Sequence, residues 1–238
     1  MKLVIDVETN GFLNKLDFKI HCIVFKDIET NKLYSYNPDN LFESLKLLKK
    51  ATLLIGHNIQ GFDLPAIKKY FKYNYTGEIL DTLLCSRLIW TNRQELDFQI
   101  KDVPPKLIGR HSLESWGYRL GLRKGDFQEH NSFDVWTLDM QDYCERDVEV
   151  THKLYDLIIN NNYSKEAIEL EHKFAYWIRK QERFGVYFDE SSAENLLSIL
   201  TKRRLQLEEN LAVVFPEWQQ SQGYKRYKRD NKKKGIKA

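Results

Sequence analysis

The chain contains 238 residues, which is enough for one domain of about 150–190 residues and an appendage. Its three cysteines lie far apart and show no Cys-x-x-Cys spacing, which argues against a zinc site and against a disulfide framework. No apolar run reaches the ~18 residues of a membrane span, and the N-terminus does not have the pattern of a signal peptide. We therefore expect a cytoplasmic protein that has no membrane partner.

The net charge of +3 is unevenly distributed along the chain. Residues 224–238 hold eight Lys and Arg against one Asp, whereas residues 1–223 have a balance of −4. Residues 216–238 are therefore expected to form a basic, flexible tail, which is either only solvated or in contact with phosphates. The slightly acidic body would need local basic patches to hold a polyanion.

The first half of the chain has the pattern of a layered α/β domain with a mixed sheet, because strands come first and then alternate with helices. Short apolar runs predict buried strands at residues 3–7, 20–25, 33–36 and 53–55. Helical spacing of apolar residues predicts helices at residues 42–48, 64–71, 81–90, 112–120 and 138–159. The segments between them at residues 92–110 and 121–137 are predicted to be loops.

Two further helices are predicted after a polar Asn-Asn-Asn run. The first covers residues 164–184 and stops at Gly185, and the second runs from about Asp189 to Val214, with Ser191 and Glu194 as a candidate capping box. The predicted organisation is a domain over residues 1–160, a helical segment over residues 161–215, and the tail over residues 216–238.

The carboxylates Asp6 and Glu8 directly follow the apolar residues of the first predicted strand. Two other Asp-x-Glu pairs occur in the chain, so the spacing alone has little meaning. On a strand, however, residues i and i+2 point to the same side. Two carboxylates at the end of a buried strand repel each other unless a cation neutralises them, so we interpret the pair as a metal site. The alternative is an exposed strand end.

Tyr143 and Asp147 lie four residues apart on a predicted helix and therefore share one face. A tyrosine with a pKa of about 10 is a poor base at neutral pH. A metal ion lowers the pKa of bound water from 15.7 toward roughly 7. We therefore expect Tyr143 to orient a water molecule beside a metal on Asp147.

Three contexts, Val4–Thr9, Asn58–Asp63 and Tyr143–Asp147, resemble in this order the Exo I, II and III motifs of the DEDD 3′–5′ exonucleases. Position 142, five before Asp147, is Asp and not His, so the chain resembles the tyrosine subclass. The resemblance implies a ribonuclease-H-like fold. It also implies two divalent metal ions, Mg²⁺ with Mn²⁺ as a substitute, held by Asp6, Glu8, Asp63 and Asp147.

Longer segments are similar to the family-A DNA polymerases of T-odd short-tailed phages; they are residues 81–89, 111–121, 171–173, 180–185 and 188–189. In those polymerases the first stretch is the proofreading domain, and the two later helices begin the polymerase module. The polymerase motifs lie downstream of this point, so the resemblance does not imply polymerase activity here. It does not distinguish between a standalone enzyme, a split-gene subunit and a truncated chain. It also implies that the protein is located in the cytoplasm of a bacterial host.

The resemblance also implies four substrate-binding residues. Thr9 corresponds to a backbone-contact position beside the scissile end, and Asn58 to a position near the 3′-terminal nucleotide, although Asn58 could serve only as a turn residue. Phe12 and Leu13 could separate the last bases or could simply pack in the core. Four tryptophans are expected to be core residues and not base-stacking platforms; they are Trp90, Trp116, Trp136 and Trp177.

The predicted activity is metal-dependent 3′→5′ hydrolysis of single-stranded or frayed DNA ends, which releases 5′-mononucleotides. A polymerase subunit is a candidate partner. One alternative is an exonuclease that trims RNA. The other is a non-catalytic module that binds nucleic acid or a polymerase subunit, and the intact carboxylates argue against it.

Overall fold

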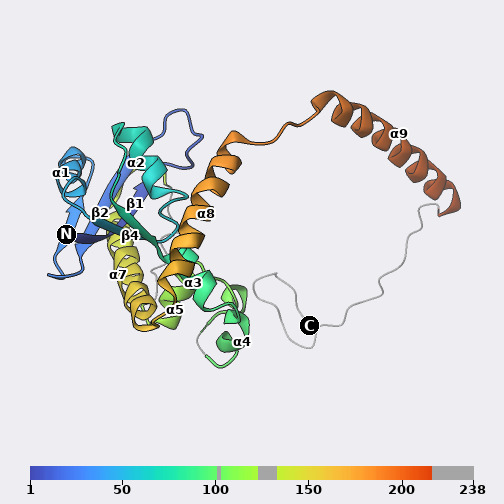
Figure 1. Cartoon of the computed structure of the whole chain (residues 1–238). Coiled ribbons are helices and arrows are strands. Elements are labelled where there is room, and N and C mark those ends of the chain that lie inside the picture. Colours follow the sequence, from blue (N-terminus) through green and yellow to red (C-terminus); the bar gives the residue numbers. More distant parts are fainter. Residues whose placement is uncertain (101–102, 123–132, 216–238) are drawn as a thin grey trace, which may run out of the picture. The chain divides into compact units, whose positions relative to one another are not determined.

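The computed structural model describes residues 1–100, 103–122 and 133–215, so the predicted tail at residues 216–238 lies outside the described residues. The chain forms two compact units, and the first covers Met1–Phe184 (Figure 1). The second begins at Gly185 and contains helix α9 (Glu190–Val214). Within the described ranges, no helix is both long enough and apolar enough to cross a membrane.

The first unit is built on a five-stranded mixed sheet, which confirms the predicted α/β fold. In spatial order the strands are β3 (Leu33–Tyr36), β2 (Ile20–Asp27), β1 (Lys2–Thr9), β4 (Leu53–Gly56) and β5 (Glu78–Asp81). The β1–β2 and β2–β3 pairs are antiparallel, and the β1–β4 and β4–β5 pairs are parallel. The sequence analysis missed β5, because it has only two apolar residues and runs directly into a helix.

Strand β1 is the central strand, and its side chains feed a separate hydrophobic cluster on each face of the sheet. Leu3, Ile5 and Val7 enter one cluster, which helix α2 (Asp63–Phe71) covers with Ala66 and Ile67. Val4 enters the other, which helix α7 (Leu138–Asn160) covers. Side chains alternate along a strand, so Asp6 and Glu8 share the face of Val4 and lie toward α7.

The remaining helices of the first unit follow the predicted pattern, with one correction. They are α1 (Ser44–Leu48), α3 (Thr82–Ile89), α4 (Arg93–Asp97), α5 (Leu113–Arg119) and α8 (Lys165–Phe184). The prediction of an uninterrupted loop over residues 92–110 is wrong, because α4 and a 3₁₀ turn at Pro105–Leu107 lie within it. Helix α4 is short and has no apolar period, and a buried Arg93–Asp97 ion pair closes its single turn.

The two C-terminal helices form where they were predicted. The capping box at Ser191 is wrong, since α9 is capped by Asp189, whose carboxylate accepts the Ser192 N–H at 3.0 Å. Helix α8 lies in the first unit and packs on α3. The boundary between functional modules near residue 160 stays a prediction.

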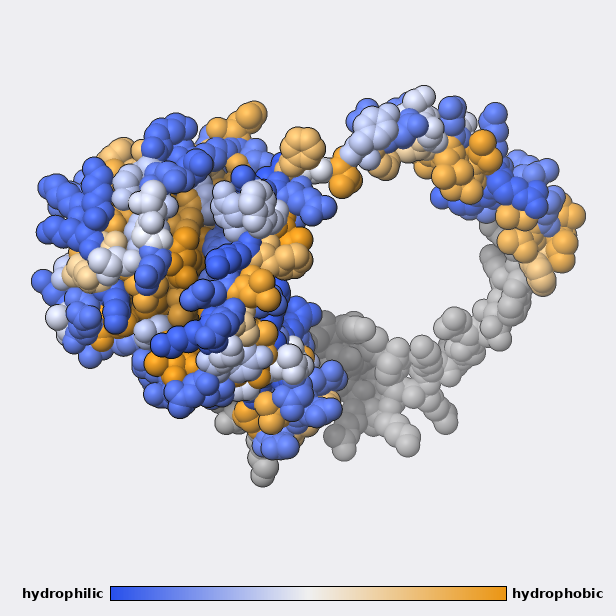
Figure 2. Space-filling view, viewed as in Figure 1, coloured by the Kyte–Doolittle hydropathy of each residue, from blue (hydrophilic) through white to orange (hydrophobic). Residues whose placement is uncertain are grey.

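The tryptophans do not all lie in the core. Trp116 is fully buried and packs against Trp90, with ring centroids 4.9 Å apart, as predicted. Trp177 on α8 is 63% exposed, so its assignment to the core is wrong. Apolar residues reach the surface of α8 and of α9, where Figure 2 shows them in orange.

Candidate metal centre

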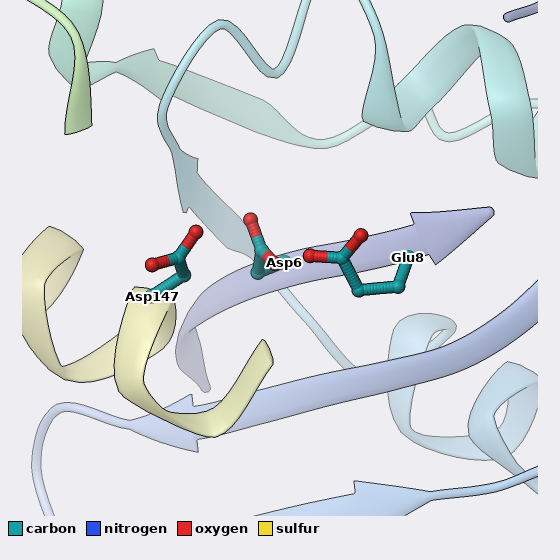
Figure 3. A group of neighbouring side chains, drawn as sticks. All are labelled: Asp6, Glu8 and Asp147. Atoms are coloured by element: carbon teal, nitrogen blue, oxygen red, sulfur yellow. The ribbon is translucent and has the colours of Figure 1, made fainter. Parts of the chain in front are cut away.

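Three carboxylates from two distant segments meet at one place. Asp6 and Glu8 on β1 and Asp147 on α7 each offer an oxygen atom, and these atoms all lie within 4.8 Å of one another. Figure 3 shows the three side chains directed to the same space between the strand and the helix. The structure thus brings together three of the four predicted metal ligands.

Local structure explains why each side chain faces this space. Asp6 and Glu8 are two residues apart on an extended strand, so they point to the same side. Helix α7 begins after Thr137, whose hydroxyl caps the Met140 N–H at 3.2 Å. Its buried stripe has helical spacing and includes Tyr143, Cys144 and Asp147. The same stripe that packs the helix on the sheet therefore carries Asp147 to β1.

Asp63, the fourth predicted ligand, is the buried first residue of α2. Its pKa is raised well above the ordinary value, first by burial and second by the charge of Asp6. Asp63 is not one of the three residues whose oxygen atoms cluster within 4.8 Å. Its carboxylate is nevertheless close enough to Asp6 for the two charges to oppose each other, and a divalent cation would relieve this repulsion.

We expect the metal-free protein to lose stability as the pH rises above 3.8, the ordinary pKa of this carboxyl. Between 3.8 and the raised pKa, folded Asp63 binds a proton that the unfolded chain has released. The free energy of unfolding then falls by up to ~1.4 kcal/mol per pH unit. Urea unfolding in chelator at several pH values measures this slope, and Asp63→Asn should flatten it. An equal slope in the variant contradicts the assignment.

Two buried residues of α7, Tyr143 and Cys144, interact with the carboxylates. Burial, followed by the charges of Asp147, Glu8 and Asp6, raises the pKa of Tyr143, so its hydroxyl stays protonated. The buried Cys144 thiol donates to Asp6 Oδ2 at 3.3 Å, and burial raises its pKa as well. The contact of Cys144 with Asp6 was not predicted, because position 144 on the α7 stripe indicates a buried side chain but not its partner on β1.

Asp81 organises the loop that leads into Asp63. Its carboxylate accepts the backbone N–H groups of Asn58 at 2.9 Å and of Gln60 at 3.3 Å. It also accepts the Leu83 N–H at 3.0 Å and thereby caps α3. Asn58 has a left-handed backbone conformation with φ of 63°, which asparagine tolerates better than most residues. Asp81 therefore both caps α3 and fixes the turn before Asp63.

The predicted substrate-binding residues lie around the end of β1 and this loop. Thr9 is buried, and its hydroxyl donates to Gly11 O at 2.8 Å. Phe12 is 81% exposed, so core packing is excluded for it, whereas Leu13 packs partly against the core. The exposed ring of Phe12 is free to meet a base, and the substrate roles of all four residues stay predictions.

The residues present fit hard divalent cations. Mg²⁺ and Mn²⁺ prefer oxygen ligands, and three carboxylates with a fourth nearby supply them. Without a cation, burial and the charge of Asp6 oppose ionisation of Asp63. The donor set and its electrostatic cost both agree with a metal centre.

Comparisons with known proteins agree with the fold. The RNase_H superfamily model matches residues 3–159. The chain is 31% identical over 269 aligned residues to a DNA-directed DNA polymerase of Enterobacteria phage T3. It is 30% identical over 269 residues to a DNA-directed DNA polymerase of Escherichia phage T7. Each match covers 93% of this chain, and the chain spans only 38% of the length of either relative.

Among solved structures, Escherichia coli RNase D, described as an exoribonuclease involved in structured RNA processing, matches with a TM-score of 0.51. The match covers 76% of this chain and 45% of RNase D, with 14% identity. At this identity, the likeness supports the fold and nothing finer.

Proposed function

Because the chain belongs to the RNase H superfamily, we propose that it is a metal-dependent 3′→5′ exonuclease of the proofreading type that removes 5′-mononucleotides from DNA. The observation that carries the proposal is the meeting of Asp6, Glu8 and Asp147 at one point between β1 and α7. Asp63 and Tyr143 adjoin this cluster through the charge interactions that raise their pKa values.

Each residue has a distinct role in the proposed reaction. Asp6, Glu8 and Asp147 would hold one divalent ion, and Asp6 would share a second ion with Asp63. When bound, the ions would supply Lewis acidity and a bound water of lowered pKa. The Tyr143 hydroxyl would orient the attacking water, because a phenol with an ordinary pKa of about 10 is a poor base at neutral pH.

DNA is the proposed substrate because the 30–31% identical relatives are DNA-directed DNA polymerases. Single-stranded or frayed ends should be favoured, since the end of a duplex must unpair before its last phosphate can reach the carboxylates. The phage origin of the relatives also supports a site of action in the cytoplasm of a bacterial host. A polymerase polypeptide is the proposed partner, because the 30–31% identical relatives are DNA-directed DNA polymerases.

Trimming of RNA is the second candidate, because a carboxylate cluster that binds metal ions can serve the hydrolysis of either nucleic acid. The test is digestion of 5′-labelled DNA and RNA strands of one sequence with Mg²⁺ or Mn²⁺, with and without chelator. We expect metal-dependent, stepwise shortening of the DNA strand with release of 5′-mononucleotides. Faster trimming of RNA would replace the substrate assignment, and no trimming of either strand would support a non-catalytic module.

We expect Tyr143→Phe to lower the trimming rate roughly 10- to 150-fold while the metal requirement is kept. The variant keeps the buried ring and removes only the hydroxyl. A hydrogen bond to a charged or strongly polarised group contributes about 1.5–3 kcal/mol, which corresponds to that range of rates. Single-turnover digestion with saturating enzyme measures the change. A rate equal to that of the wild type would remove Tyr143 from the mechanism.

A further inference from the structure

Helix α8 makes two hydrogen bonds to the segments that shape the candidate site. His172 and Arg179 lie on the same face of α8, because seven residues are close to two helical turns. His172 Nε2 accepts the backbone N–H of Asp81 at 2.7 Å. Arg179 Nη2 donates to Asn58 Oδ1 at 2.9 Å. The helix that was predicted to open a polymerase module thus contacts both partners of the turn before Asp63.

The hydrogen bond from Arg179 identifies which end of the Asn58 side-chain amide is the oxygen and which is the nitrogen. A guanidinium group has donors only, so the atom that it contacts must be the carbonyl oxygen. The Nδ2 end of the amide is then the donor end. Arg179 is itself oriented, since its Nη1 donates to Glu182 Oε2 at 2.8 Å and its side chain is 28% exposed.

Three further features of the structure restrain Asn58. Its backbone N–H is bonded to Asp81, and its backbone is left-handed. Its side-chain amide lies directly against Gly61, where any added Cβ would collide with the amide. The hydrogen bond from Arg179 adds a direct contact to the side-chain amide and selects Oδ1 as its acceptor end.

The His172 contact anchors α8 for this purpose. Because Nε2 accepts a hydrogen bond from the Asp81 N–H, the ring hydrogen is on Nδ1, and the Nδ1–H donates a hydrogen bond to Ile168 O at 2.7 Å. The imidazole therefore bridges the backbone of α8 and the backbone at the end of β5. This bridge joins α8 to the end of β5 on the helix face that also carries Arg179.

We propose that Arg179 is a positioning residue that holds the Asn58 amide so that Nδ2 donates to an acceptor oxygen of the 3′-terminal nucleotide. The inference rests on the proposed function and adds a part of the site contributed from outside the three motifs. Arg179 acts through Asn58 and not on the reacting atoms. Its loss should therefore weaken substrate binding and leave the chemical step unchanged.

The experiment compares KM and kcat for trimming of 5′-labelled single-stranded DNA by full-chain variants. Arg179→Met keeps the length of the side chain and removes its donors, and we expect KM to rise roughly tenfold with kcat unchanged. Arg179→Lys restores one donor and should recover part of the loss. Asn58→Asp keeps a partner for Arg179 but has no Nδ2, so it should raise KM as much as Asn58→Ala does.

A double-mutant cycle separates this role from independent contacts. If Arg179 works only through Asn58, the combination of Arg179→Met with Asn58→Ala will be no worse than Asn58→Ala alone. Losses that multiply would overturn the proposal. Lys173→Ala is the matched control, because it removes one cation from the same helix at a 77% exposed side chain and should leave KM unchanged.

Two further outcomes distinguish a merely structural role and a failure of the proposed function. Partial unfolding would lower kcat through the active fraction without a change in KM, and that result would contradict positioning. If the wild-type chain trims no DNA, the proposed function fails, but amide hydrogen exchange still tests the contact. Faster exchange at residues 57–62 in Arg179→Met than in Lys173→Ala would support it, and equal exchange would overturn it.

Discussion

Replacing both Asp6 and Glu8 by alanine should abolish metal-dependent trimming of 5′-labelled single-stranded DNA. We expect kcat/KM to fall by at least about 10³-fold, because two of the three clustered carboxylates are lost and no other group in the cluster can hold the ion alone. The variant should remain folded, and its metal-free form should be as stable as the wild type or more stable, since like charges are removed. Undiminished trimming would refute the assignment.

The chain offers a matched control for this experiment. Asp27 and Glu29 have the same spacing and carry the same charge, but they lie at a hairpin turn where Asp27 Oδ1 accepts the Glu29 N–H at 3.0 Å. Their double replacement by alanine should leave trimming by the folded protein near the wild-type rate. Added Mg²⁺ or Mn²⁺ should raise the Tm of the wild type and of this control, but not of Asp6→Ala with Glu8→Ala.

Asp97→Asn should lower the free energy of unfolding by about 3–5 kcal/mol, the range for a broken buried ion pair. The fully buried Asp97 carboxylate is bonded to Arg93 Nη2 at 2.8 Å, Arg119 Nη2 at 2.6 Å and the Gly109 N–H at 2.9 Å. Both guanidinium groups also lie over the Trp116 ring, so they cannot turn toward water without loss of packing. Neutralising Asp97 leaves two buried cations without their counter-charge.

The pKa of Asp97 gives this prediction a second readout. Burial on its own would raise this pKa, but the bonds from Arg119, Gly109 and Arg93 outweigh burial and hold it below 3.8. The stability that the network contributes is therefore present above pH 3.8 and lost as the pH falls further. Urea unfolding near neutral pH and in acid measures both effects. Glu169→Ala, which breaks an exposed pair with Lys173, should change stability by less than about 1 kcal/mol.

Most of the architecture follows from local patterns in the chain. Apolar runs of strand length located β1 to β4, and helical spacing located α2, α3, α5, α7, α8 and α9. These elements bury residues at a regular period, so the period is visible without a structure. Strand β5 and helix α4 were not found, because β5 has two apolar residues and α4 has no apolar period and is held by the ion pairs of Asp97 with Arg93 and Arg119.

The residues of the candidate site also fall into two groups, those that local spacing predicts and those that it does not. Asp6, Glu8, Tyr143 and Asp147 could be paired by their spacing on a strand and on a helix, since each spacing fixes a shared face. No such spacing predicts three other contacts, which are those of Asp81 with the Asn58 backbone, of Cys144 with Asp6, and of Arg179 with the Asn58 side chain. These contacts join segments that are 23, 138 and 121 residues apart.

For Asp6 with Glu8 and for Tyr143 with Asp147, residue order alone determines which side chains share a face and could face a metal. The reason is that the periods of a strand and of a helix are short-range properties. Whether those faces meet depends on how α7 packs across β1. Which residues of α8 contact the turn before Asp63 depends on where α8 lies against α3. Such placements result from the burial of whole surfaces at once, and no local spacing of residues encodes them.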